Sequence, residues 1–156
     1  MNQFSVIHST MTLERSYAAS PERVFAAFAD PAEKRRWFAE SEHHDILAFE
    51  LDFRLGGAER LQYRFKGNAP IKGMVLTAEG RHLDIVPNRR IVIAQSMSIG
   101  DAPFSAVLAT FEIEPSGQGA KLLLTHQGAY FNGADGPERR EQGWRALLDR
   151  LNMAVS

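Results

Sequence analysis

The sequence contains no cysteine, and its 156 residues carry almost no net charge. Without thiols the chain can form no disulfide, no thiolate nucleophile and no thiolate metal site, and it suits a reducing compartment. The formal net charge of −1 lacks the basic excess that normally marks proteins of nucleic acids or of acidic membrane surfaces. We therefore expect neither nucleic acid nor a membrane among its partners.

Long apolar runs, repeats and low-complexity tracts are also missing. No apolar run approaches the roughly 20 residues that a membrane-spanning helix needs. Residues 1–11 lack the basic start and apolar stretch of a signal peptide, so cytoplasmic residence is the expectation by elimination. The length suits one core. We expect a single domain over residues 11–156, preceded by a short disordered or strand-like N-terminal extension over residues 1–10.

Sequence motifs for cofactors and metals are equally scarce. The chain has no glycine-rich phosphate loop, nucleophile elbow or metal-binding helix motif. Adjacent His43 and His44 project in different directions, and no third ligand with usable spacing accompanies them, whereas zinc needs three or four converging groups. We interpret this pair as part of a solvated loop and expect no metal and no cofactor.

The first elements that the sequence predicts are a strand and two short helices. Residues 11–17 alternate between apolar and polar, which indicates a half-buried strand. Ser20-Pro21 is typical of a helix start, because a serine side chain can cap the first turn and because proline is tolerated within that turn. Asp30 with Glu33 forms a capping-box pattern, which predicts a second helix ending near residues 37–38.

A run of strands and one long helix follow. In the strand over residues 47–53, Leu47, Phe49 and Leu51 should share an apolar face. Gly80 is a candidate bulge in the strand over residues 73–86. Hairpin-length connections favour an antiparallel sheet. An apolar stripe at helical spacing predicts that the C-terminal helix lies against this sheet. The strands are expected over 47–53, 59–66, 73–86, 91–97, 107–113 and 121–126, and the stripe is Trp144, Leu147, Leu148, Leu151 and Val155.

This order of elements, with several local motifs, resembles the START-like (SRPBCC, helix-grip) superfamily. Within it the chain looks like the branch of activator of heat-shock ATPase homologue-like, polyketide cyclase-related proteins. The motifs are Arg15 with residues 19–25, Asp30-Pro31 with residues 36–38, Asp52 to Gly57, residues 83–87 with 89–92, residues 125–130, and Gly143-Trp144 with residues 148–151.

The resemblance implies an α+β helix-grip fold. A curved antiparallel sheet of about six to seven strands would wrap around the long C-terminal helix, with two short helices after the first strand and an apolar cavity inside.

We interpret three short charged motifs as structural rather than functional. Asp52 and Arg54 should pair at the glycine turn, and the basic pairs 35–36 and 139–140 should lie on solvated helix faces.

Five side chains are candidates to contact a ligand. Tyr63 and Gln95 place polar tips on otherwise apolar strand faces, which suits either a cavity with a few hydrogen bonds or a wetted rim. His126 follows Leu122 and Leu124 on one strand face and is either a core histidine or an acid–base group. The full set is Tyr63, His82, Gln95, His126 and Trp144.

Three functions remain open at this point. The first is a binding module for a small hydrophobic or amphipathic molecule in the cavity. The second is a cyclase- or hydrolase-like enzyme in which His126 is the acid–base residue, which would need a partner within hydrogen-bond reach. The third, implied by the family name, is a co-chaperone that activates a heat-shock ATPase. A homodimer is also plausible if residues 91–97 offer an apolar edge.

Overall fold

The computed structural model describes residues 5–68 and 70–156. Residues 1–4 of the expected extension, and Ala69 in the expected turn after the third strand, lie outside the described residues. The elements, in chain order, are β1 (Ile7–Tyr17), α1 (Pro21–Ala29), α2 (Pro31–Lys34), a π-helical turn η1 (Arg35–Ala39), β2 (His44–Leu51), β3 (Ala58–Phe65), β4 (Val75–Val86), β5 (Arg90–Ile99), β6 (Ala102–Ser116), β7 (Gly119–Tyr130) and α3 (Pro137–Val155).

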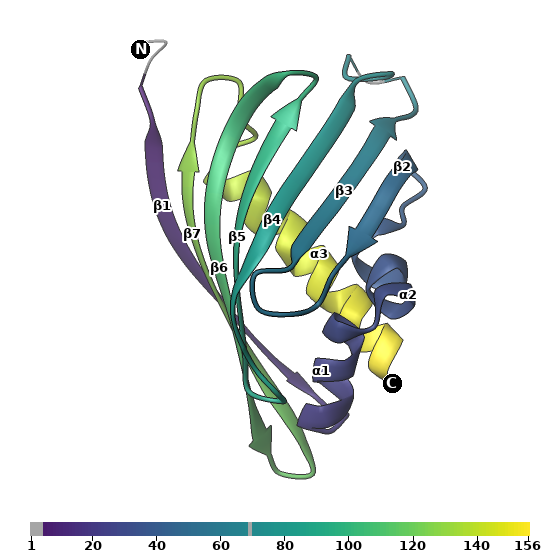
Figure 1. The fold of residues 1–156 in the computed structure, drawn as a ribbon, viewed down its shortest axis with the longest axis vertical. Helices are drawn as coiled ribbons and strands as arrows, with labels where there is room; N and C mark the ends of the chain where they lie inside the picture. The colour runs from purple at the N-terminus through teal and green to yellow at the C-terminus, as the bar shows by residue number, and fades with distance from the viewer. Residues whose placement is uncertain (1–4, 69) are drawn as a thin grey trace.

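All seven strands join one antiparallel sheet in the order β1-β7-β6-β5-β4-β3-β2. The sheet curves, and α3 runs diagonally across it with α1 and α2 at one end (Figure 1). The predicted α+β helix-grip fold is confirmed. The expected apolar edge at residues 91–97 is wrong, because β5 lies between β4 and β6 and the free edges are β1 and β2.

The first strand begins earlier than the alternation of residues 11–17 predicts. β1 starts at Ile7, which pairs with Tyr130, so residues 7–10 take the strand-like form of the expected extension and join the sheet. At the other end, Tyr17 is buried and its hydroxyl donates to the backbone oxygen of Leu148 at 3.0 Å. This bond ties the N-terminal strand to the C-terminal helix.

The helix starts follow the predicted capping chemistry in part. Ser20 Oγ accepts from Arg23 N at 3.1 Å, and Asp30 Oδ1 accepts from Ala32 N at 2.9 Å. Glu33 does not complete the capping box, because its carboxylate binds the Arg23 guanidinium at 2.6 Å instead. A charged partner forms a stronger hydrogen bond than a backbone amide. The pair therefore joins α1 to α2.

Two strand details differ from the sequence pattern. The β2–β3 register shifts between Ile46 and Ala48, so Leu47 is exposed instead of sharing a buried face with Phe49. The expected bulge at Gly80 is absent, and the irregularity of β4 comes after His82. A Cβ added at Gly80 would lie 2.8 Å from the backbone oxygen of Ala94, so this glycine permits close strand contact rather than a bulge.

The hydrophobic core is divided into two clusters. The larger one joins β1, the start of β5, β6 and β7 to α1, η1 and the C-terminal half of α3, and it includes Phe28, Trp37, Leu122 and Leu148. The smaller one covers the inner faces of β3 and β4 with Ala39 and Phe104. Since α3 packs mainly on η1, α1 and β1, it leaves part of the inner face of β3–β5 without a helix against it.

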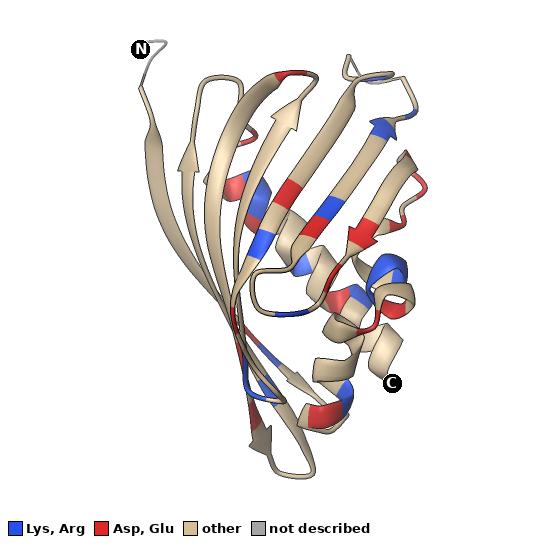
Figure 2. Ribbon diagram, viewed as in Figure 1, with Lys and Arg blue, Asp and Glu red and all other residues tan. Residues whose placement is uncertain are grey.

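Charge on the sheet is mixed in sign. Both acidic and basic residues lie on β3 and β4 (Figure 2), where Arg60 Nε binds Glu79 Oε1 at 3.0 Å. Residues 102–111 and 122–130 contain no Lys, Arg, Asp or Glu. Within residues 5–68 and 70–156, none of the helices combines the length and the apolar character needed to cross a bilayer.

The packing of α3 predicts how a truncation would act. Leu148→Ala should lower the free energy of unfolding by about 2–5 kcal/mol, because it removes a fully buried side chain and leaves a cavity. Met153→Ala, on the same helix but 77% exposed, should change it by less than about 0.5 kcal/mol. Urea titration of both variants measures this. Equal losses would contradict the packing of α3 against the larger cluster.

Candidate functional site

A cavity of about 910 Å³ lies between the inner faces of β3–β5 and the N-terminal half of α3. Its volume falls in the range of small-molecule sites, which are mostly apolar with a few placed polar groups. Segments 40–44 and 133–135 and the side chain of Ile71 form its rim. The apolar side chains of its wall are Phe38, Leu61, Phe65, Leu76, Ala78, Met97, Ile99, Phe104, Trp144 and Leu147.

The predicted ligand-contacting residues separate into two groups. Tyr63, Gln95 and Trp144 line this cavity. His126 lines only a much smaller space behind it, and His82 lines neither. The His82 ring is buried, its Nδ1 is 3.0 Å from the backbone oxygen of Gly57, and it packs edge-on against Phe53. Its contacts hold the glycine turn against β4.

Tyr63 is stacked on His44 at the cavity wall, with ring centroids 3.7 Å apart. The His44 Nε2 lies 2.6 Å from the backbone oxygen of Ala39, and since a carbonyl only accepts, Nε2 carries the proton. Burial lowers the pKa of His44, so the ring is neutral at pH 7. The solvated-loop interpretation is therefore wrong for His44 and confirmed for His43, which is exposed.

Burial also governs the ionisation of Tyr63. It raises the pKa of the Tyr63 hydroxyl to about 12, because the phenolate would lose its hydration. The hydroxyl therefore stays protonated at neutral pH and can donate a hydrogen bond into the cavity.

Arg140 is held at one end of the cavity by a set of polar and aromatic contacts. Its Nε and Nη2 bind the two carboxylate oxygens of Asp135, each at 2.8 Å, and Nη2 also donates to Ser105 Oγ at 3.0 Å. The guanidinium lies over the rings of Tyr130 and Phe104, at 5.2 and 5.9 Å from their centroids. Arg140 is only 8% exposed, so its expected place on a solvated helix face is wrong.

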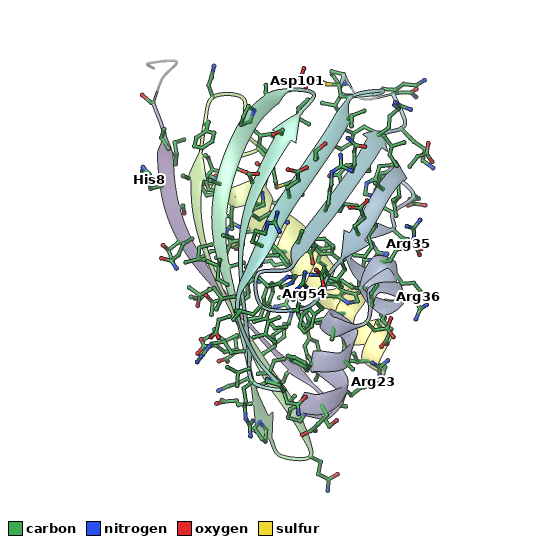
Figure 3. All side chains as sticks on the ribbon, in the orientation of Figure 1. His8, Arg23, Arg35, Arg36, Arg54 and Asp101 are labelled. Carbon is green, nitrogen blue, oxygen red and sulfur yellow. The ribbon has the colours of Figure 1, made fainter. Side chains whose placement is uncertain are left out.

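The other charged groups follow their structural interpretations. Arg35 and Arg36 are exposed on the outer side of the helical segment (Figure 3). Arg54 Nε donates to Asp52 Oδ2 at 2.7 Å beside the glycine turn, which confirms the turn-stabilising pair. In the part of the chain that the structure describes, no three His, Asp or Glu side chains converge as metal ligands.

Behind the cavity lies a second space of about 10 Å³, roughly the room that one water needs. Phe38, Gln95 and Trp144 border both spaces and so form the wall between them. Lys34 and Glu59 line the smaller space and form a buried, hydrogen-bonded ion pair. Buried charges need such a partner because the protein interior solvates them poorly.

His126 faces this smaller space from β7. It is 2% exposed, and among the described residues its Nδ1 has no hydrogen-bond partner. Burial, and then the positive charge of Arg140, lower the pKa of His126 to about 4, so the ring is neutral at pH 7. Its ring centroid lies 6.5 Å from that of Trp144.

Three site residues were not predicted from the sequence, namely His44, Lys34 and Arg140. Arg140 carried a usable signal, because it precedes Trp144 by four and Leu148 by eight residues and so extends the apolar stripe of α3. Lys34 likewise precedes Phe38 by one helical turn. The position of His44 depends on the loop before β2, whose sequence has no apolar–polar periodicity from which that position could be predicted.

Comparison with known proteins gives the family. The family described as Activator of Hsp90 ATPase homolog 1-like protein matches residues 18–156. No curated protein matches the sequence. The crystal structure of the Mll3558 protein from Rhizobium loti is 45% identical, with a TM-score of 0.86, over 96% of this chain and 99% of that one.

Two further solved structures are similar over most of their length. An uncharacterized protein from Rhizobium leguminosarum is 35% identical, with a TM-score of 0.87, over 97% of this chain and 96% of that one. The AHSA1 protein from Silicibacter pomeroyi is 25% identical, with a TM-score of 0.73, over 94% of this chain and 97% of that one.

The buried ion pair predicts a specific pattern of stability losses. Lys34→Met should cost about 3–5 kcal/mol of unfolding free energy, because it leaves the Glu59 carboxylate buried without a partner. The double variant Lys34→Met/Glu59→Leu should regain most of this loss. Arg60→Met, which breaks a surface pair, should cost less than about 1 kcal/mol. Denaturant titration compares the four proteins, and a double variant no better than the single one would contradict the prediction.

Acid should destabilise the protein partly through His126. Its pKa is about 4 in the folded chain against 6.5 when unfolded, so between these values the unfolded state binds more protons. The stability of the wild type should therefore fall as pH drops from 6.5 towards 4, by about 2 kcal/mol at pH 5 from this group.

His126→Leu should lack this part of the acid sensitivity. Its stability relative to the wild type should rise as pH is lowered from 7 to 5, as measured by urea titration at each pH. His8→Leu, at an exposed histidine of β1 (Figure 3), controls for the loss of one imidazole and should follow the wild type. Parallel pH profiles of the wild type and His126→Leu would show that His126 does not contribute.

Proposed function

The chain belongs to the family of Activator of Hsp90 ATPase homolog 1-like proteins, and we propose that it binds a small hydrophobic or amphipathic molecule in its main cavity. The observation that carries this proposal is the cavity itself, with about 910 Å³ between β3–β5 and α3. Its wall is built mainly from aliphatic and aromatic side chains, so an apolar molecule that enters it leaves water over most of its surface.

The polar groups of the cavity would orient such a molecule. Tyr63 and Gln95 present uncharged polar tips from the sheet, and Arg140 presents a charged guanidinium, paired with Asp135, from the helix. The charged groups Glu40, Glu42 and Arg139 belong to the rim, where water can reach them. An amphipathic ligand with an apolar body and few polar atoms fits this distribution better than a highly charged one.

Acid–base catalysis by His126 has weaker support. Among the described residues, its imidazole makes no hydrogen bond to Asp, Glu or Tyr, and it faces a space too small for a substrate. A pKa of about 4 leaves it unable to act as a proton donor near pH 7. Activation of a heat-shock ATPase is supported only by the family name. Ligand binding is therefore the function that we propose.

Gly143 offers a direct test of cavity binding. It lies on α3 in the cavity lining, and a Cβ added there meets no atom within 4 Å. Gly143→Phe should fill part of the cavity, while the loss of a helical glycine stabilises the helix by roughly 0.5 kcal/mol. Gly143→Ala stabilises the helix by roughly 1 kcal/mol without filling the space, and it is the matched control.

Native mass spectrometry with solvent extraction measures what each protein retains. The ligand is either a small molecule that the wild type and Gly143→Ala retain, or an added hydrophobic dye. We expect its affinity for Gly143→Phe to be at least tenfold lower than for the other two proteins. Thermal unfolding verifies that all three proteins are folded. Equal binding by the folded Gly143→Phe protein would place the ligand outside this cavity and contradict the proposal.

A further inference from the structure

The donors of Arg140 are not all used by the protein. A guanidinium has five N–H groups. Nε and Nη2 are engaged by Asp135 and Ser105, whereas Nη1 donates to no acceptor among the described residues. Nη1 is also absent from the buried atoms that lack a partner, so it keeps some accessible surface. Since Arg140 lines the main cavity, this surface is available to a bound molecule.

The position of this free donor is fixed before any ligand arrives. Two bonds to Asp135, one to Ser105 and the flanking rings of Phe104 and Tyr130 restrain the guanidinium from several sides. A restrained donor loses little conformational entropy on binding. The arrangement is therefore suited to recognition at a defined point, beyond its structural role of holding residue 135 against the sheet.

Tyr63 supplies a second donor to the same cavity. Its ring is fixed by the stack on His44 and an edge contact with Phe65 at 5.1 Å. Its hydroxyl has no hydrogen-bond partner among residues 5–68 and 70–156 and remains protonated at neutral pH. Tyr63 packs in the same apolar cluster as Phe104, and the Arg140 guanidinium lies over the Phe104 ring, so Tyr63 and Arg140 belong to the same part of the cavity.

The charge around these donors selects the kind of acceptor. Asp135 engages Arg140 through both carboxylate oxygens, so the pair has no net charge. Of the other two arginines in the cavity lining, Arg150 donates to the backbone oxygens of Arg36 and Glu40, and Arg139 is exposed to water at the rim. A buried carboxylate would therefore add a net negative charge beside Asp135 and lose its hydration. A carbonyl oxygen avoids both costs.

We propose that Arg140 Nη1 and the Tyr63 hydroxyl form a polar subsite that accepts an uncharged oxygen acceptor, such as a ketone, ester or amide carbonyl, at one end of an otherwise apolar ligand. This inference rests on the proposed function, since it names the ligand chemistry of the same cavity. Arg140 would then contribute to ligand specificity, while its contacts with Asp135 and Ser105 have a structural role.

The test uses three probes with one naphthalene body. They are 6-propionyl-2-(dimethylamino)naphthalene, the propyl analogue that lacks the carbonyl, and 6-(dimethylamino)-2-naphthoate. The measured quantity is the selectivity ratio, which is the Kd of the propyl compound divided by that of the ketone. Comparing this ratio between variants cancels the difference in hydrophobicity between the two probes.

Arg140→Met should lower the selectivity ratio about tenfold, because a hydrogen bond from a charged donor is lost for the ketone only. Arg145→Met, the same substitution at an exposed arginine of α3 that is not among the lining residues of the cavity, should leave the ratio unchanged. The emission of the ketone moves to longer wavelength when its carbonyl accepts a hydrogen bond. It should therefore be blue-shifted in Arg140→Met relative to the wild type, an effect that loss of stability alone would not produce.

Two further variants keep the test valid if Arg140→Met does not fold. Arg140→Met/Asp135→Leu removes both members of the ion pair, so that no carboxylate is left without its partner. Tyr63→Phe removes only the second donor and should lower the ratio several-fold, with a smaller blue shift.

The outcomes separate this inference from the proposed function. If the ketone and propyl probes bind the wild type but the ratio is unchanged in the variants, the subsite is overturned and cavity binding stands. Preference of the wild type for the naphthoate over the ketone would also overturn it, because the subsite would then accept an anion. If no probe binds the wild type, the proposed function fails and the subsite fails with it.

Discussion

One helix cannot cover a seven-stranded sheet, and this mismatch of widths shapes the molecule. A helix with its side chains is about 10 Å across, whereas seven strands at about 4.8 Å spacing extend over about 29 Å. Here α3 packs mainly on β1, α1 and η1, so the larger hydrophobic cluster lies on one side of the sheet. The inner face of β3–β5 stays apart from the N-terminal half of the helix, and the cavity occupies that space.

The polar groups inside follow from the same geometry. Side chains that face the uncovered part of the sheet are removed from bulk water without being fully packed, so each needs a partner or an opening to the cavity. Lys34 and Glu59 satisfy each other, and Arg140 is neutralised by Asp135. Tyr63 lines the open space of the cavity. The cavity is thus apolar in composition but contains a small number of donors whose positions are restrained.

Much of the fold was predictable because its signals are local. Alternation in β3, the capping residues Ser20 and Asp30, and the stripe of α3 each depend on periodicity within a few residues, and the structure bears them out. The register shift that exposes Leu47 was not predictable, because a bulge depends on how β2 meets β3.

For the candidate site, the sequence by itself determined the chemical type of the inner faces. Tyr63, Gln95 and Trp144 lie on apolar faces that could be read from spacing alone, and all three line the cavity. Only the tertiary structure decided which charges are buried. Arg140 is separated from Ser105 by 35 residues, and Lys34 from Glu59 by 25. Whether a charged side chain faces solvent or a partner depends on contacts between distant segments, which no local pattern records.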